Sequence, residues 1–155
     1  MSWTPPGGYL TEFPSNSPEE TQALGERIAC NLKPGSVLAL QGGLGAGKTC
    51  LAKGIARKLG VREEVTSPTY TIVSEYEAFF NGSPLPFYHI DAYRLSGEDD
   101  FEALGGRDLL YGGGICLVEW SERIEPALPG EVIRVEIEIL AENRRIIRVM
   151  GAEIS

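Results

Sequence analysis

The chain has 155 residues, of which 43% are hydrophobic and 23% charged, and this length and composition suit a globular protein with one core. They exclude a largely disordered chain, and no apolar run is long enough to cross a bilayer. The formal net charge of −8 argues against broad contact with a nucleic-acid backbone. The first residues lack the features of a secretory signal, so we expect a single cytoplasmic domain, residues 1–155, without membrane contact.

The three cysteines are expected to be reduced. Cys30, Cys50 and Cys116 cannot all pair, and none of them has the spacing of a zinc site. We therefore predict buried thiols, which fit a reducing compartment.

The first elements follow from capping residues and apolar spacing. A short strand is expected over 9–13, followed by a helix that Ser15 or Ser17 can cap. The helix is predicted to run to about Lys33, because Pro34 and the glycine after it stop it. Its apolar residues recur every four positions at Leu24, Ile28 and Leu32. Next come a strand over 36–41, a glycine-rich loop and a helix over 48–59.

The middle of the chain predicts two strands and a capped helix. The strands cover 70–76 and 85–92, with a turn at 81–84. Ser96 is expected to cap the helix, whose first turn carries three acidic residues at 98–100. We favour a solvated helix start here over a metal site.

The last third predicts one buried strand and a hairpin. Residues 115–120 form an apolar run that ends near a carboxylate. Residues 131–140 and 144–150 alternate apolar and charged side chains, which is typical of an antiparallel hairpin with one solvated face.

The strongest chemical signal is the segment GGLGAGKT at 42–49, which has the complete Walker A spacing between a strand and a helix. Its glycines let backbone amides point at phosphate oxygens, and the start of the helix adds a positive end. Lys48 is expected to reach the β and γ phosphates, and the hydroxyl of Thr49 to bind magnesium. The predicted nucleotide-binding residues here are Gly42, Gly43, Leu44, Gly45, Ala46, Gly47, Lys48, Thr49 and Cys50.

Two acids are candidates for the catalytic carboxylate of such a site. Glu119 ends the apolar segment ICLVE, and Asp91 ends the segment FYHID. Acids at the carboxyl ends of strands lie on the edge of an α/β sheet where ligands bind. Either can hold the magnesium shell or orient water, and Glu119 is also a candidate metal ligand.

Other residues are ambiguous from the pattern alone. The hydroxyl-rich turn at 65–70 suits a segment that senses the γ-phosphate, although the residues taken alone favour hydroxyls that only shape a turn. Trp120 and Arg123 follow Glu119 closely, but a lone Trp is more often part of a core. His89, the only histidine, is favoured as a packed strand residue over a general base.

Four motifs in order give a resemblance to a known family. GGLGAGKT lies at 42–49, SPTYT at 67–71, HIDAYRL at 89–95 and VEW at 118–120. This series resembles the bacterial TsaE family, also called YjeE, the ATPase component of the machinery that makes threonylcarbamoyladenosine in tRNA. The resemblance covers nearly the whole chain. Tyr70 and Cys50 stand where Phe and Thr are common in that family, and neither difference removes a charged or metal-binding group.

The resemblance implies an enzyme that binds ATP and Mg²⁺ and hydrolyses ATP weakly alone. It implies stimulation by a complex of TsaB and TsaD, with tRNA reached only through that complex. For single residues it implies phosphate and magnesium roles for Lys48 and Thr49, and a switch-like role for Thr69. It further implies that Asp91, Glu119 and Thr69 act in hydrolysis and that Trp120 lies near the nucleotide.

Two alternative functions each require a motif that the sequence lacks. A P-loop small-molecule kinase usually has an arginine-rich lid, whereas only Arg123 lies between Trp120 and the final hairpin. A GTP-dependent switch needs the NKxD motif that reads guanine, which is absent after the loop. We expect a three-layer α/β sandwich of the P-loop NTPase type, with a mixed sheet that is parallel at the loop and antiparallel toward the chain ends.

Overall fold

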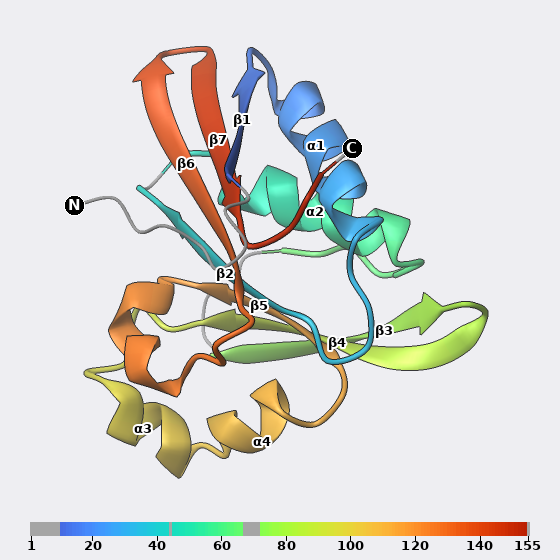
Figure 1. Ribbon diagram of the computed structural model, residues 1–155, viewed down its shortest axis with the longest axis vertical. Coiled ribbons are helices and arrows are strands. Elements are labelled where there is room, and N and C mark those ends of the chain that lie inside the picture. The colour runs from blue at the N-terminus through green and yellow to red at the C-terminus, as the bar shows by residue number, and fades with distance from the viewer. Residues whose placement is uncertain (1–9, 44, 67–71, 155) are drawn as a thin grey trace.

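A computed structural model describes residues 10–43, 45–66 and 72–154, and in it one mixed sheet of seven strands carries helices on both faces (Figure 1). The strands are β1 (Leu10–Ser15), β2 (Val37–Gly42), β3 (Val73–Phe80), β4 (Ser83–Asp91), β5 (Ile115–Glu119), β6 (Ile133–Ala141) and β7 (Arg144–Met150). The helices are α1 (Pro18–Ala29), α2 (Lys48–Lys58), α3 (Glu98–Ala103), α4 (Gly106–Leu110) and the 3₁₀ segment η1 (Ser121–Ala127). Among these described helices, none has the length and apolar character that a membrane span requires.

The sheet has a parallel centre and antiparallel edges, as the sequence predicts. Its order is β1-β7-β6-β2-β5-β4-β3, and β2 pairs in parallel with both β5 and β6, while β4 pairs in parallel with β5. At one edge the antiparallel strands come from the two chain ends, as expected. At the other edge they form the β3–β4 hairpin from the middle of the chain.

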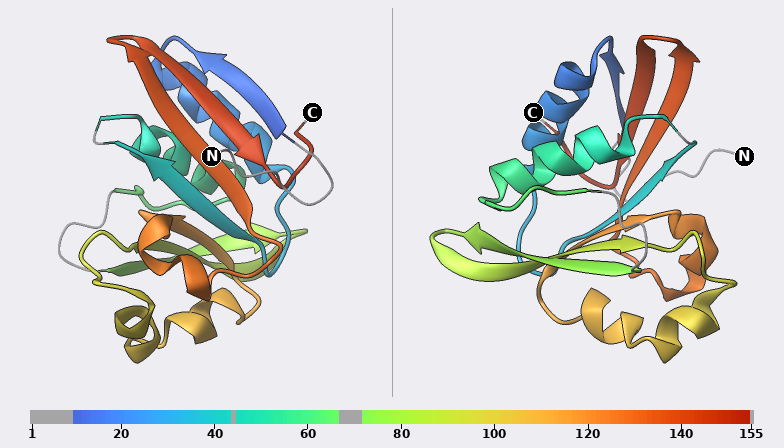
Figure 2. Two further views of the ribbon diagram at one scale, coloured as in Figure 1. Left: turned by 60° about the vertical axis from the view of Figure 1, so that its left-hand side comes forward. Right: turned by 180° about the vertical axis from the view of Figure 1, so that it is seen from behind.

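The core consists of two layers, one on each face of the sheet (Figure 2). Alternate residues of β2 show the division, because Leu38 and Leu40 pack with α1 and α2 while Val37 and Ala39 pack on the opposite face. That opposite layer receives one large side chain from each of its helical segments, namely Phe101, Leu110 and Ile124. These four residues of β2 are almost fully buried, as expected for a central strand covered on both sides.

Helix α1 begins as predicted and ends earlier. Ser17 is the N-cap, and its Oγ accepts a hydrogen bond of 3.1 Å from the N–H of Glu20. The α-helix stops at Ala29 rather than near Lys33, because the N–H groups of Asn31 and Leu32 bond three residues back instead of four. A tighter turn therefore replaces the last predicted helical turn.

The predicted cap of α3 is wrong by one residue. Gly97 is the N-cap, and Ser96 lies before it. The Oγ and N–H of Ser96 both donate to Oδ2 of Asp100, at 2.5 and 3.0 Å. These hydrogen bonds lower the pKa of Asp100, since they stabilise its charged form. Across the described ranges no cluster of three or more potential metal ligands occurs.

The β3–β4 hairpin has a shorter turn than predicted. Only Asn81 and Gly82 form the turn, with φ of 50° and 80°, and Ser83 already belongs to β4. Two residues with positive φ match the right-handed twist of the flanking strands, so pairing continues up to them. As a result β3 extends to Phe80. The predicted strand start at Tyr70 lies outside the described residues.

The cysteines are free thiols, but they are not all buried. Cys116 is buried, Cys50 is half-buried and Cys30 is exposed, so the prediction of a buried thiol is wrong for Cys30. Burial raises the pKa of Cys116 to about 12, because the apolar surroundings disfavour the thiolate.

Helices α1 and α2 approach closely at two glycines. A Cβ atom on Gly54 would lie 2.0 Å from the carbonyl oxygen of Gln22, and one on Gly25 would lie 2.4 Å from that of Leu51. Each neighbouring atom belongs to the opposite helix backbone, which cannot move aside cheaply. This close contact fixes the position of α2, and thus of the loop that precedes it.

We expect Gly54→Ala to lower the free energy of unfolding by about 2 kcal/mol, because the added methyl group must push the two helix backbones apart. Urea unfolding followed by circular dichroism measures this change. Gly130→Ala is the matched control, since a Cβ at Gly130 meets nothing within 4 Å, and it should change stability by less than about 0.5 kcal/mol. Equal stability of the two variants would contradict the close-packing argument.

Candidate functional site: a glycine loop facing two strand-end carboxylates

The loop between β2 and α2 depends on glycine conformations. Gly45 and Gly47 have φ of 77° and 108°, a region that side chains with a Cβ rarely adopt. The N–H of Ala46 bonds to the carbonyl of Gly43 at 3.1 Å and closes the turn. The predicted residues Lys48, Thr49 and Cys50 lie in the first turn of α2. Leu44 lies outside the described residues.

The N-terminal end of α2 carries an uncompensated positive dipole. Its N-cap is Gly47, which has no side chain, and its first turn contains no acidic residue. By contrast, α1 has Ser17 as its cap and two glutamates in its first turn. The free N–H groups of a helix start attract anions, and Lys48 adds a full positive charge at the same place. The geometry of this loop is that of an anion-binding site.

Lys48 is 8% exposed, and its ammonium group lies over an aromatic ring. Its Nζ is 4.1 Å from the ring centre of Trp120, which is a cation–π contact. Trp120, which the sequence left ambiguous, is therefore in contact with Lys48, the lysine of the glycine loop motif.

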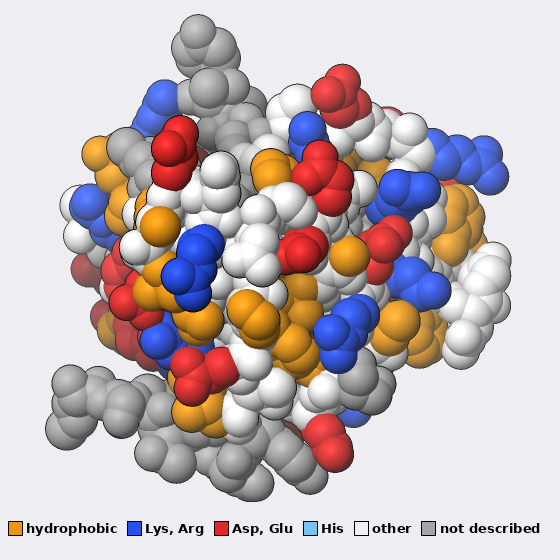
Figure 3. Space-filling model, turned by 90° about the horizontal axis from the view of Figure 1, so that it is seen from above, with side chains coloured by type: hydrophobic (Ala, Val, Ile, Leu, Met, Phe, Trp, Pro, Cys, Tyr) orange, Lys and Arg blue, Asp and Glu red, His pale blue; other side chains and the backbone are white. Residues whose placement is uncertain are grey.

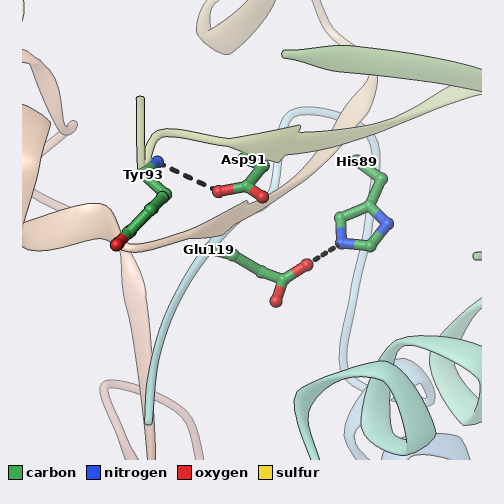
Figure 4. Close-up of polar contacts among 4 residues, drawn as sticks. All are labelled: His89, Asp91, Tyr93 and Glu119. Carbon is green, nitrogen blue, oxygen red and sulfur yellow. Dashed lines mark hydrogen bonds and ion pairs between the residues drawn. The ribbon is translucent and has the colours of Figure 1, made fainter. Parts of the chain in front are cut away.

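The two candidate acids lie side by side. Asp91 and Glu119 are direct partners in the parallel register of β4 and β5, at the carboxyl ends of both strands. Glu119 is only 4% exposed, whereas Asp91 is half-buried. The Oδ1 of Asp91 accepts a 3.0 Å hydrogen bond from the N–H of Tyr93 (Figure 4). Strand β2, which leads into the glycine loop, pairs with β5 so that Leu40 is opposite Glu119.

His89 belongs to the same group of side chains. It lies two residues before Asp91 on β4, so both point to the same face of the sheet. Its Nε2 is 2.5 Å from Oε2 of Glu119, and its side chain is fully buried (Figure 4). The sequence favoured a packed strand residue, and the structure adds a direct contact to a candidate catalytic acid.

Trp120 also connects this site to the surface. Its backbone has φ of 57°, an unusual left-handed conformation for a large residue, at the point where β5 turns into η1. Its ring packs against that of Tyr93 at 4.9 Å between centres, and the guanidinium of Arg123 lies 5.4 Å from the Tyr93 ring centre. Tyr93 and Arg123 are exposed, so this row of side chains runs from the lysine outward.

Arg145 is a site residue that sequence reasoning missed. From β7 its Nε and Nη2 donate hydrogen bonds of 3.1 Å to the carbonyls of Ala46 and Gly45. Its Nη1 donates to the carbonyl of Ala141 at 2.8 Å, which ties the end of β6 to the same side chain. In the sequence it is one charged residue in an alternating strand, so no local signal marks it.

A cavity of about 160 Å³ lies beside the loop. It is lined by the beginning of α1, by Gly45–Gly47 and Cys50 of the loop and α2, and by the turn between β6 and β7. Arg145 is also part of its wall. Thr69 and the turn at 67–70, predicted as the γ-phosphate sensor, lie outside the described residues, and their role stays a prediction.

Comparison with known proteins agrees with this geometry. The family model described as threonylcarbamoyl adenosine biosynthesis protein TsaE matches residues 15–147. The chain is 41% identical over 135 residues to a Treponema pallidum protein named tRNA threonylcarbamoyladenosine biosynthesis protein TsaE, covering 87% of this chain and 96% of the relative. It is 46% identical over 129 residues to the Bacillus subtilis protein of the same name, covering 83% and 78%. The crystal structure of Bacillus YdiB matches with a TM-score of 0.71 and 36% identity, covering 93% of this chain and 87% of that one.

The fold and site define an α/β protein with a mixed seven-stranded sheet and a glycine loop at the carboxyl edge of its parallel centre. Within that class the match spans most of the chain. The chain belongs to the TsaE family.

Replacing Arg145 by Met tests whether this side chain holds the loop. The carbonyls of Gly45 and Ala46 would lose their donors, so we expect the free energy of unfolding to fall by about 1–2 kcal/mol. Amide hydrogen exchange at residues 45–49 should become faster. Arg144→Met, the exposed neighbour on β7, is the control. Unchanged exchange in the Arg145 variant would show that the loop holds its shape without it.

Proposed function

We propose that the protein is a magnesium-dependent ATPase that acts in tRNA threonylcarbamoyladenosine biosynthesis together with the TsaB and TsaD proteins. One observation carries the proposal: an uncapped helix start, with Lys48 in its first turn, lies at the same sheet edge as the adjacent acids Asp91 and Glu119. Membership of the TsaE family supports the pathway.

Phosphate binding follows from the loop. The N–H groups at the start of α2 and the glycine turn donate to phosphate oxygens, and Lys48 supplies the matching charge. The cavity of about 160 Å³ between α1, the loop and the β6–β7 turn offers space for the part of the nucleotide beyond the phosphates. Lys48 would then leave the Trp120 ring for the stronger attraction of the phosphates.

The available donors fit a magnesium ion bound mainly by substrate. Thr49 and Glu119 offer oxygen atoms, the type of ligand that Mg²⁺ prefers. The described residues contain no ready-made cluster of three protein ligands, which suits an ion that keeps several waters and binds phosphate oxygens. When bound there, the ion supplies neutralisation of the charge that develops on the phosphates.

The two acids are proposed to act in hydrolysis. Glu119 is nearly buried and held by His89, so it can act on a water molecule in a fixed direction. Asp91 is more open and accepts from the Tyr93 backbone, which fits a role in shaping the water shell. Thr69 is proposed as the residue that senses the γ-phosphate.

The output is proposed to be a change of shape that partners detect. On the face shown in Figure 3, acidic and basic side chains are interspersed over the described residues, without a broad basic patch of the kind that follows a phosphate backbone. Together with the net charge of −8, this supports contact with tRNA only through TsaB and TsaD. We propose that this contact takes place in the cytoplasm. The kinase alternative has no supporting observation in the described residues.

The central test is ATP binding and turnover of the wild type and of Lys48→Ala, with and without purified TsaB and TsaD. We expect turnover that rises when the partners are added, and loss of tight ATP binding in the variant with an unchanged circular dichroism spectrum. Lys58→Ala, an exposed lysine on the same helix, is the control. Normal ATP affinity in a folded Lys48→Ala protein would refute the phosphate site. Phosphate transfer to a small molecule would restore the kinase alternative.

The acids are tested by Asp91→Asn and Glu119→Gln, which keep the shape of each side chain and remove its charge. Partner-stimulated hydrolysis should fall at least tenfold in each, a loss of about 1.4 kcal/mol of transition-state stabilisation. Calorimetry should show ATP affinity that changes much less. Asp99→Asn, an exposed acid on α3, is the matched control. A variant that hydrolyses ATP at the wild-type rate would assign its residue a structural role.

A further inference from the structure

His89 forms a buried pair with Glu119 at a position where an apolar side chain would fill the core equally well. His89 is fully buried on the sheet face that carries α1 and α2, among apolar neighbours such as Leu117, its partner in register on β5. Its Nδ1 has no hydrogen-bond partner among the residues that the structure describes. A buried polar ring with one unsatisfied nitrogen is costly compared with an apolar side chain of similar size. Packing alone therefore does not account for a histidine at this position.

The contact that does distinguish histidine here is the one to Glu119. Nε2 of His89 lies 2.5 Å from Oε2 of the carboxylate, and both side chains are buried. Glu119 has three side-chain torsions, so fixing its carboxylate in one orientation requires a partner. Figure 4 shows Oε2 directed at the imidazole and the second oxygen directed away from it.

His89 lies further from the carboxyl edge of the sheet than Glu119, so it contacts the Glu119 carboxylate from the interior. Asp91 is level with Glu119 in the sheet, whereas His89 is opposite Leu117, two residues further from the carboxyl edge. The imidazole therefore holds Glu119 from the interior side. The second carboxylate oxygen remains available at the edge where the glycine loop lies.

We propose that His89 is a positioning residue for hydrolysis: its Nε2–H donates to Oε2 of Glu119 and fixes the other oxygen for a water molecule. This inference rests on the proposed ATPase function. A carboxylate accepts hydrogen bonds, so Nε2 carries the hydrogen of this contact. His89 does not contact substrate, and its effect passes entirely through Glu119.

The first test observes the imidazole of His89 directly and does not depend on ATPase activity. It is possible because His89 is the only histidine in the chain. Long-range ¹H–¹⁵N spectra of protein prepared without a histidine tag report one imidazole. We expect Nε2 to carry a proton with a strongly downfield shift, and Glu119→Gln to move that signal. An imidazole protonated only at Nδ1, or a signal that ignores Glu119→Gln, would overturn the proposal.

The second test separates positioning from packing by comparing two variants. His89→Leu fills similar space without a donor, and we expect kcat to fall about tenfold to a hundredfold, as for other residues that orient a ligating carboxylate, while the affinity for ATP stays near the wild-type value. His89→Gln places an amide donor close to the original Nε2 and should recover part of kcat. Phe87→Leu, two residues away on the same face of β4, is the control for a disturbed core and should keep kcat.

A double variant makes the dependence on Glu119 explicit. In the Glu119→Gln background, adding His89→Leu should lower kcat little further, because the carboxylate that His89 positions is already gone. Independent, multiplying losses would overturn the proposal, as would a His89→Leu protein with wild-type kcat. If the wild type itself hydrolyses no ATP, the proposed function fails and this inference falls with it. If the wild type is active and His89→Leu is equally active, only the positioning role fails.

Discussion

The parallel pairing of β2, β5 and β4 is the constraint on which the site depends. Parallel strands end at the same edge of a sheet, so the segments that follow them are brought together although they are far apart in sequence. The register places Leu40 and Asp91 on either side of Glu119. Side-chain alternation then sends Glu119, Asp91 and His89 to one face. A shift of one residue in β4 would turn Asp91 and His89 into the opposite core layer and dismantle the site.

The glycine loop is held in place by contacts from three directions. Behind it, α2 is fixed against α1 by the close approach at Gly25 and Gly54. From β7, Arg145 donates hydrogen bonds to the carbonyls of Gly45 and Ala46, and within the loop the N–H of Ala46 bonds to the carbonyl of Gly43. Below it, β2 is buried on both faces. In the proposed function, a loop held in one shape would not have to be ordered when phosphate binds, which favours binding.

What could be predicted from the sequence is local, and what could not is long-range. Glycine spacing, the Ser17 cap and the alternation in the last two strands are written in adjacent residues, and the structure bears out the elements that they predict. The hydrogen bond from Arg145 to Gly45 joins positions 100 residues apart, and the His89–Glu119 pair joins positions 30 apart. Such contacts depend on strand order and register, which hydrophobic periodicity does not specify. The predicted cap is misplaced because the Ser96 hydroxyl bonds to the side chain of Asp100, which the sequence pattern does not reveal. The predicted turn at 81–84 is too long because Asn81 and Gly82 adopt positive φ and reverse the chain in two residues.

Trp120 shows how the site can hold its lysine before a nucleotide is present. As a left-handed residue it directs its ring back over Lys48, at a backbone cost of about 1–2 kcal/mol. The cation–π contact returns about 0.5–2 kcal/mol, so the two terms nearly cancel. A lysine buried without any partner would be far more costly. In the proposed function, a lysine held this weakly would transfer to a phosphate group with little loss. The Trp120 ring also packs on exposed Tyr93, whose backbone N–H bonds to Asp91. The residue that follows Glu119 thus connects Lys48 to the outside of the molecule through direct ring contacts.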